Sequence, residues 1–437
     1  MRRWARRSSL ASACRTKWGN SMAHEVKDLS LAEQGKRNIE WAEMQMGALL
    51  KVRERFARER PLSGYRIGMA LHITKETAVL VQTLIAGGAE VAITSCNPLS
   101  TQDDVAAALA SDGTNVFGYK GETREEYYSY LGRVIEFEPQ ITIDDGCDLV
   151  SEIHSKHVEL IPRIVCGCEE TTTGVIRLRA MEKENALKYP ILAINESSTK
   201  HLMDNYYGTG QSVIDGILRA TNSLLAGKTF VVLGYGDCGK GVALRAKGLG
   251  ANLIVTEVNP LRALQAKMDG FRVMPIGEAA PLGDIFVTVT GDIRALTTDH
   301  IRQMRDGAVL CNAGHFDVEI DVAGLEEMAA QKREIRPLFV EYVVDHKRVF
   351  LCGEGRLVNL ACAEGHPSTV MAMSFCNQAL GVEYGIAHRG ELEPRVYRLP
   401  EEIDTAVARL QLEALGVKID TLTQEQAQYL SSWGSGT

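Results

Sequence analysis

The 437-residue chain lacks the features of a membrane, nucleic-acid-binding or disulfide-stabilised protein. No apolar run approaches the roughly twenty residues that cross a bilayer, so we expect no membrane association. Acidic residues outnumber basic ones, 56 to 48, whereas a nucleic-acid-binding protein presents a basic face. The ten cysteines form no C-x-x-C pair, which disfavours a zinc site and a disulfide framework. We therefore expect a cytoplasmic protein whose partner is a small molecule.

The N-terminal segment departs from this composition. Residues 1–21 contain six Lys or Arg and no acid. An organelle-targeting peptide has such a composition, and upstream coding sequence before a start at Met22 fits equally well. Both explanations place the segment outside the fold. Further on, residues 31–58 have the periodicity of a helix.

A glycine-rich stretch predicts a dinucleotide-binding βαβ unit. A β-branched strand pattern over 230–233 ends in three glycines spaced G-x-G-x-x-G, at Gly234, Gly236 and Gly239. The first glycine permits a tight turn, the second lets a pyrophosphate approach, and the third lets helix and strand pack closely. A second strand pattern stops at Glu257, whose carboxylate can accept ribose hydroxyls and would repel a 2′-phosphate. The unit predicts NAD, with Arg262 leaving NADP as the minor alternative.

Strand and helix patterns alternate along the rest of the chain, and its length requires more than one core. We predict an α/β protein with two doubly wound, Rossmann-like domains. The substrate-binding domain comprises residues 22–195 with 369–415, and the NAD-binding domain comprises residues 211–365. Residues 196–210 are the predicted hinge, and residues 416–437 form a short C-terminal tail.

Several polar side chains follow predicted strand ends, where ligands bind in open α/β sheets. They are His72, Asn97, Asp145, Lys200, Asp204, Asn205, His315 and His366. We expect His72, Asn97 and Asp145 to converge on one crevice. The spacing of Lys200 and Asp204 also suits an ordinary surface ion pair. His315 and His366 could each be structural.

These motifs together resemble the S-adenosylhomocysteine hydrolase family, in its short archaeal and thermophile form. The similarity extends from about Leu29 to Tyr429. It is found in segments that occur in the family's order: Ala-Leu-His72-Ile-Thr-Lys-Glu-Thr, Ser100-Thr-Gln-Asp, Asp-Asp145-Gly, Glu-Glu170-Thr-Thr-Thr-Gly, Ser-Thr-Lys200, Gly-Tyr-Gly-Asp-Cys-Gly-Lys-Gly, Gly-His315-Phe-Asp, Gly-Arg-Leu-Val-Asn359 and Gly-His366-Pro-Ser.

The resemblance implies reversible hydrolysis of S-adenosylhomocysteine to adenosine and homocysteine with one tightly bound NAD per subunit. In the family the ribose is oxidised at C3′, homocysteine is eliminated, water adds, and the ketone is reduced. The implied catalytic residues are His72, Asp145, Lys200, Asp204, Asn205 and His315. Among them, Lys200 takes the 3′-hydroxyl proton with a lowered pKa, Asp145 acts at C4′, and His72 acts at C5′.

The resemblance also implies binding residues and a homotetramer. Substrate contacts are implied for Thr74, Glu76, Glu170, Asn195, Lys200, Asp204 and His366. NAD contacts are implied for Thr171, Thr172, Thr173, Asn205, Gly234, Gly236, Asp237, Gly239, Glu257, Asn312 and Asn359. Gln82 matches a glutamine that helps to bind a monovalent cation near the adenine in some bacterial members.

The chain departs from the family pattern at a few positions. Thr209 replaces a cysteine found in many members, so a thiol there is not needed. Glu364 replaces the methionine that usually precedes the Gly-His-Pro loop, and we expect it to alter the base pocket. A variant preferring S-inosylhomocysteine is therefore one alternative. An ordinary NAD-dependent dehydrogenase and a silent NAD-binding regulator are two others.

Overall fold

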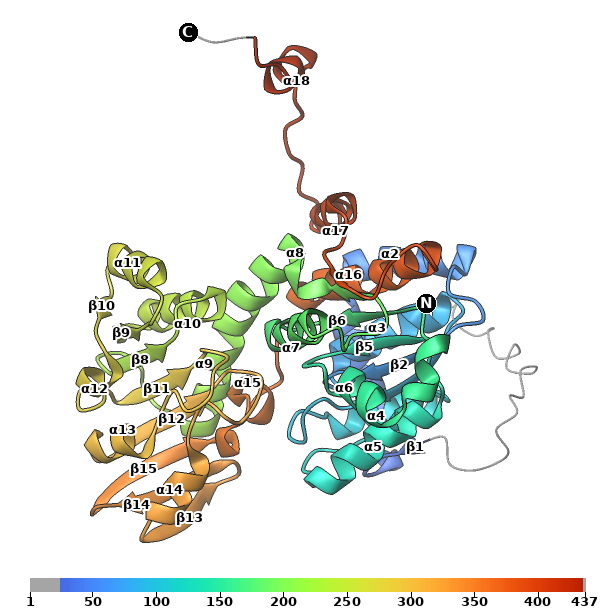
Figure 1. The fold of residues 1–437 in the computed structure, drawn as a ribbon. Helices are drawn as coiled ribbons and strands as arrows, with labels where there is room; N and C mark the ends of the chain where they lie inside the picture. Colours follow the sequence, from blue (N-terminus) through green and yellow to red (C-terminus); the bar gives the residue numbers. More distant parts are fainter. Residues whose placement is uncertain (1–23, 435–437) are drawn as a thin grey trace, which may run out of the picture.

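The computed structural model describes residues 24–434, so the prediction for residues 1–21 lies outside the described residues. Two sheets, one parallel and one mostly parallel, are each covered by helices on both faces and form two lobes that are joined by helices (Figure 1). The predicted doubly wound α/β fold is confirmed. Among the described helices, none has the length and apolar character needed to span a bilayer.

The first sheet contains eight strands, and all neighbouring strands are parallel. In spatial order they are β1 (His24–Glu25), β4 (Asn115–Phe117), β3 (Glu90–Thr94), β2 (Arg66–Ala70), β5 (Ile141–Asp144), β6 (Cys166–Glu169), β7 (Ile191–Ala193) and β16 (Val396–Tyr397).

Nine helices pack on this sheet. One face is covered by α1 (Ala32–Glu43), α2 (Gly47–Glu59), α3 (Lys75–Ala86), α4 (Asp103–Ser111), α16 (Ser368–Ala387) and α17 (Glu401–Ala414). The other face is covered by α5 (Arg124–Glu136), α6 (Asp148–Lys156) and α7 (Thr172–Lys183). The helix predicted over 31–58 is therefore two helices, which are separated by a turn at residues 44–46.

The second sheet also contains eight strands. In spatial order they are β10 (Arg272–Val273), β9 (Asn252–Thr256), β8 (Thr229–Leu233), β11 (Ile285–Thr288), β12 (Ala308–Asn312), β15 (Lys347–Cys352), β14 (Phe339–Val344) and β13 (Gln331–Arg336). The first six are parallel, whereas β14 and β13 add an antiparallel edge that the sequence analysis does not predict.

The alternation of side chains along β8 gives this sheet two buried faces. Phe230 and Val232 join a core with α9 (Thr209–Thr221) and α10 (Asp237–Gly248). Val231 and Leu233 point to the opposite core, which also contains residues of α12 (Ile276–Ala279), α13 (Thr298–Gln303) and α14 (Val322–Met328). A strand buried on both faces explains the continuous apolar run that precedes the glycine loop.

The predicted hinge is helical rather than an irregular loop. The 3₁₀ turn η3 (Ile194–Glu196) is followed by the extended residue Ser197. From there α8 (Ser198–Lys200), the π-helix η4 (His201–Gly208) and α9 continue without a break. Short π-helical segments occur often at functional sites.

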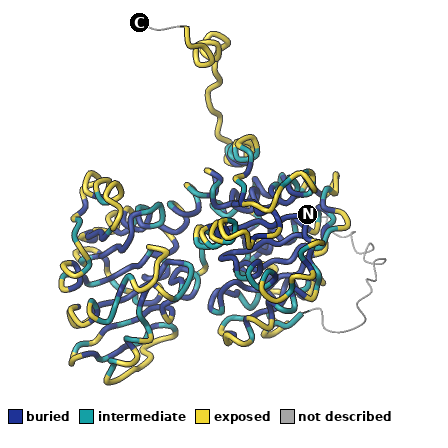
Figure 2. The backbone as a smooth tube through the Cα atoms, in the orientation of Figure 1, coloured by how far each residue is buried: buried dark blue, intermediate teal, exposed yellow. Residues whose placement is uncertain are grey.

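The remaining helices are short or lie near the two ends of the described chain, and among them α15 is buried and carries the cavity-lining Asn359. They are η1 (Leu29–Leu31), η2 (Val158–Arg163), α11 (Pro260–Met268), η5 (Gly353–Gly355), α15 (Val358–Ala361) and α18 (Gln424–Leu430). Helix α18 forms within the predicted tail, and every described residue from Glu413 onward is exposed (Figure 2).

Candidate active site

A cavity of about 950 Å³ lies between the carboxyl ends of the two sheets. Residues from both lobes line it, and they include most of the predicted site residues. The predicted residues in its lining are His72, Thr74, Glu76, Asp145, Glu170, Thr171, Thr172, Thr173, Lys200, Asp204, Asn205, Gly234, Gly236, Asp237, Glu257, His315, Asn359 and His366. The predicted residues Asn97, Asn195, Gly239, Asn312 and Gln82 are not among the lining residues.

The neighbouring strands β5 and β6 each end in two consecutive acidic residues. In each pair, the first residue binds backbone amides and the second lines the cavity. Asp144 accepts hydrogen bonds from the Asp145 and Val150 amides, and Glu169 accepts them from the Gly146 and Thr171 amides. Burial raises the pKa of Asp144 to about 7 and the pKa of Glu169 well above its usual range. The next residue of each pair, Asp145 or Glu170, lines the cavity instead, because successive extended residues point in opposite directions.

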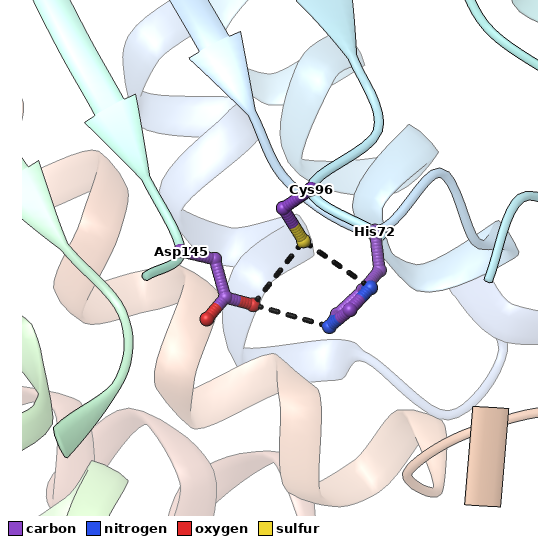
Figure 3. A group of neighbouring side chains, drawn as sticks. All are labelled: His72, Cys96 and Asp145. Atoms are coloured by element: carbon purple, nitrogen blue, oxygen red, sulfur yellow. Dashed lines mark hydrogen bonds and ion pairs between the residues drawn. The ribbon is translucent and has the colours of Figure 1, made fainter. Parts of the chain in front are cut away.

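His72, Cys96 and Asp145 follow the adjacent strands β2, β3 and β5 and meet at one sheet edge (Figure 3). His72 Nδ1 lies 2.7 Å from Ser100 Oγ and 3.2 Å from Cys96 Sγ, and His72 Nε2 lies 3.3 Å from Asp145 Oδ2. Burial lowers the pKa of His72 to about 4, so its imidazole is neutral at pH 7. The predicted partner Asn97 turns away and accepts a hydrogen bond from the Leu99 amide. Cys96, rather than Asn97, lies beside His72 and Asp145.

Lys200 is buried in a cage of polar groups. Its Nζ lies 2.6 Å from Asp204 Oδ2 and donates hydrogen bonds to Asn205 Oδ1 at 3.1 Å and Asn195 Oδ1 at 3.2 Å. The pair with Asp204 is therefore not a surface ion pair. Burial alone would lower the pKa of Lys200, but the Asp204 and Glu170 carboxylates outweigh it and raise the pKa. The predicted lowering of the Lys200 pKa refers to the lysine beside a cationic nicotinamide, and it stays a prediction.

The long helix α16 supplies site partners that the sequence analysis misses. Ser368 donates a hydrogen bond to Glu76 Oε1 at 2.7 Å. Gln378 donates to Glu170 Oε2 at 2.5 Å, and Ser374 donates to Glu170 Oε1. Burial raises the pKa of Glu170 to about 7, against the opposing effect of Lys200. The available signal was these three polar residues in an otherwise apolar helical run, since polar side chains that are buried need hydrogen-bond partners.

The glycine loop has the shape of a dinucleotide cradle. Gly234 has φ +102°, and a Cβ at Gly239 would lie 2.1 Å from the Gly234 carbonyl oxygen, so Gly239 packs against the turn. At Gly236 the nearest atom to an added Cβ is Arg262 Nη1 at 3.8 Å, which leaves room above the N-terminus of α10. Glu257 follows β9, lines the cavity and accepts a hydrogen bond from the Tyr235 amide at 2.7 Å.

Asn359, which also lines the cavity, carries a side-chain amide that could bind a polar substituent on a ligand ring. Asn359 Nδ2 donates to Ser212 Oγ at 3.1 Å. Its Oδ1 is buried and has no hydrogen-bond partner among residues 24–434. The cradle and this acceptor fit NAD, whose pyrophosphate and carboxamide need such groups.

The predicted residues outside the lining have other contacts. Asn195 bonds to Lys200 and to Thr172 Oγ1, and thus lies behind the cavity wall. Asn312 Nδ2 donates to the Gly314 and Gly355 carbonyls, so it shapes the loop that bears His315. Gln82 Oε1 accepts a hydrogen bond from the Arg53 guanidinium, and this positive charge opposes a cation there.

Glu364 lies outside the cavity lining, contrary to the expected effect on the base pocket. It is exposed and lies 3.0 Å from both Lys75 Nζ and Arg219 Nη1. Glu364 thus links α3 of the first lobe to α9. Thr209, by contrast, lines the cavity, and its Oγ1 lies 3.3 Å from His366 Nε2.

Comparison with known proteins assigns this arrangement to a family. Residues 205–365 match the NAD-binding domain of S-adenosyl-L-homocysteine hydrolase, and residues 23–161 match S-adenosyl-L-homocysteine hydrolase itself. The adenosylhomocysteinase of Aquifex aeolicus is 61% identical over 418 residues, which cover 95% of this chain and 100% of that protein. The chain belongs to the S-adenosyl-L-homocysteine hydrolase family. It thus has the NAD-binding domain of that family, as predicted.

Other members of the family match equally completely. The adenosylhomocysteinase of Sulfolobus acidocaldarius is 57% identical over 417 residues, and the S-inosyl-L-homocysteine hydrolase of Methanocaldococcus jannaschii is 58% identical over 414 residues. Each alignment covers 95% of this chain and 100% of the relative. The chain therefore belongs to the short archaeal and thermophile form.

Proposed function

We propose that this protein reversibly hydrolyses S-adenosyl-L-homocysteine to adenosine and L-homocysteine. The observation that supports this most directly is the presence of two separate acid–base groups beside one dinucleotide cradle. Lys200 with Asp204 forms one group, and His72 with Asp145 forms the other, and all four residues line one cavity. Simple hydride transfer needs one such group, whereas elimination and water addition need a second.

The NAD site is proposed to extend across the cavity. Gly234 and Gly236 would receive the pyrophosphate, Glu257 the adenosine ribose, and Asn359 with Thr171–Thr173 the nicotinamide end. Bound NAD supplies a hydride acceptor for C3′ of the substrate and returns the hydride at the end, so the overall reaction is redox-neutral.

Lys200 is proposed to take the proton of the 3′-hydroxyl, with Asp204 and Asn205 fixing the position of Nζ. Glu170 is proposed to hold the ribose hydroxyls from the neighbouring strand. The Asp204 and Glu170 carboxylates raise the pKa of Lys200, and a cationic nicotinamide beside Nζ would act in the opposite direction.

Asp145 and His72 are proposed to perform the elimination. A carbonyl at C3′ makes the C4′ proton acidic, and Asp145 removes it. The C5′–S bond then breaks, and the proton passes from Asp145 through His72 to the leaving sulfur. Water next adds to C5′, and one of its protons returns through His72 and Asp145 to C4′. The 3.3 Å separation of His72 Nε2 and Asp145 Oδ2 suits this relay.

The two lobes are proposed to divide the work. Residues 22–195 with 369–415 would bind substrate, residues 211–365 would bind NAD, and residues 196–210 would act as the hinge. The packing of α16 and α17 on the first sheet supports this division. From the family resemblance we also propose a homotetramer, with residues 416–437 as a C-terminal tail of each chain. Light scattering that gave fewer than four chains per particle would contradict the tetramer.

One assay tests the reaction. Protein desalted to remove free NAD is given S-adenosyl-L-homocysteine, and adenosine, homocysteine and reduced nicotinamide absorbance are followed together. Hydrolysis predicts many turnovers with no lasting nicotinamide reduction. A dehydrogenase would accumulate reduced nicotinamide without releasing homocysteine. A silent regulator would bind NAD and form no product.

The same assay should be run with S-inosyl-L-homocysteine, because a relative that is 58% identical is named S-inosyl-L-homocysteine hydrolase. In this chain Glu76 lines the cavity and accepts a hydrogen bond from Ser368. A carboxylate accepts from the amino group of adenine but repels the 6-oxygen of hypoxanthine, so we expect kcat/KM to favour the adenosyl substrate. A higher kcat/KM for the inosyl substrate would reverse this assignment.

A further inference from the structure

A lysine of the first lobe binds the end of the helix in the second lobe that carries Asn359. Lys120 follows β4, and its backbone amide donates to Asp103 Oδ1 at 2.7 Å, which anchors Lys120 to its own lobe. Its side-chain Nζ donates a hydrogen bond to the carbonyl oxygen of Ala361, the last residue of α15, at 2.7 Å. This contact therefore exists only while the two lobes lie together (Figure 1).

Helix α15 depends on contacts from outside itself. It has only four residues, and the last four carbonyl groups of an α-helix have no partner within the helix. From the second lobe, α9 packs closely against the start of α15, where a Cβ at Gly216 would lie 2.4 Å from the Val358 carbonyl oxygen. From the first lobe, Lys120 binds the Ala361 carbonyl at its end. Asn359 lies between these two contacts, so its position depends on both lobes.

Asn359 is the residue through which this support acts on a ligand. Its Oδ1 is buried, lacks a hydrogen-bond partner among residues 24–434, and belongs to a side chain that lines the cavity. In the proposed NAD site this oxygen accepts a hydrogen bond from the nicotinamide carboxamide. Hydrogen bonds weaken steeply with misalignment, so the strength of this one depends on where α15 lies. A movement of the first lobe that frees Ala361 therefore weakens the contact with NAD.

We propose that Lys120 is a positioning residue that couples closure of the first lobe to the binding of nicotinamide by Asn359. Substrate held by the first lobe brings the lobes together, Lys120 then fixes α15, and NAD is bound more tightly while substrate is present. Coupling between two binding sites is reciprocal, so bound NAD tightens substrate binding by the same factor. This role rests on the proposed NAD site but not on hydrolysis.

The test measures the dissociation constant of NAD for the full-length protein by equilibrium dialysis, with and without saturating 3′-deoxyadenosine. This nucleoside lacks the hydroxyl that NAD would oxidise, so it binds without reacting. In the wild type it should tighten NAD binding by about tenfold, within the usual range of coupling between sites. Lys120→Met should bring the ratio of the two dissociation constants close to one. Lys120→Arg keeps a cationic donor and should restore most of the wild-type ratio.

Lys27→Met is the matched control. Lys27 is exposed, and its Nζ lies 3.1 Å from Asp103 Oδ2, so it shares the aspartate that anchors Lys120 but lies at the surface of the first lobe. This variant should keep the wild-type ratio and NAD affinity. A lysine with a purely structural role would weaken NAD binding equally with and without the nucleoside. A wild-type ratio in Lys120→Met would therefore overturn the coupling.

The wild-type protein alone also decides the matter if Lys120→Met does not fold. A ratio of one in the wild type would overturn the coupling, even if the protein hydrolyses S-adenosyl-L-homocysteine at a high rate. Coupled binding in a wild-type protein that releases no adenosine or homocysteine from this substrate would support the role of Lys120 and reject the proposed hydrolysis.

Discussion

His315 and Asp145 belong to different lobes, yet His315 Nδ1 lies 3.5 Å from Asp145 Oδ1. The imidazole of His315 also covers Gly146, where an added Cβ would lie 2.3 Å from His315 Nε2. Gly146 of the first lobe therefore leaves the space that the His315 imidazole of the second lobe occupies. Gly146 has φ +105°, so both its backbone conformation and its lack of a side chain are needed.

Gly146→Ala should lower kcat/KM by about 100-fold or more, because small displacements of reacting groups have effects of that size. Gly113→Ala is the matched control. Gly113 has a similar φ of +88° but no atom within 4 Å of an added Cβ. It should cost about 1–2 kcal/mol of stability and leave activity unchanged. Thermal unfolding with steady-state kinetics on both variants checks this, and equal activity losses would contradict the role of His315.

Two alanine substitutions in the glycine loop should have different effects. Gly236→Ala meets only Arg262 at 3.8 Å, so the protein should unfold at the wild-type temperature but bind NAD at least tenfold more weakly. Gly239→Ala places a Cβ 2.1 Å from the Gly234 carbonyl and should destabilise the fold by about 1–3 kcal/mol. Calorimetry of unfolding and of NAD binding separates the two. Wild-type NAD affinity in Gly236→Ala would place the pyrophosphate elsewhere.

Lys200→Ala should lower turnover by about 10²–10⁴-fold, the usual contribution of an acid–base group. Lys200→Arg distinguishes a base from a fixed positive charge, because arginine does not release its proton in proteins. A base predicts equal losses in both variants. Substantial activity in the arginine variant, measured with NAD content matched to wild type, would mean that Lys200 acts only as a cationic donor.

Glu122→Gln should become more stable than wild type as pH rises. Burial raises the pKa of Glu122 from 4.5 to about 8. Because the folded-state pKa is the higher one, the stability that this group gives below pH 4.5 is lost progressively up to about pH 8. The difference in unfolding free energy should therefore grow across this window and then level off. Glu125→Gln, at an exposed position on α5, should show no such trend. A constant difference for Glu122→Gln would contradict the assignment.

Local sequence patterns predict the parts of the site that follow from strand ends and turns. The G-x-G-x-x-G spacing predicts the cradle, because Gly234 is needed for the turn, Gly236 for close approach of a pyrophosphate and Gly239 for packing against the turn. His72 and Asp145 follow strands of the same parallel sheet, so their meeting at one edge is also predictable. The structure brings both to within hydrogen-bonding distance of each other.

Contacts between distant segments are less accessible to sequence reasoning. Ser374 and Gln378 reach Glu170 from more than 200 positions away, and only the packing of α16 brings them there. The ionisation of Lys200 depends on how closely Asp204 and Glu170 approach it, and burial alone suggested the opposite direction. Cys96 resembled an ordinary core thiol because its partners lie on two other strands.

The π-helix η4 has a consequence for how this family can vary. Its eight residues are wound more widely than an α-helix and run from Lys200 directly into α9. Loss of a single residue here would turn everything downstream by about 100° relative to Lys200. Natural insertions and deletions should therefore accumulate in the surface loops of both lobes and be absent from this segment.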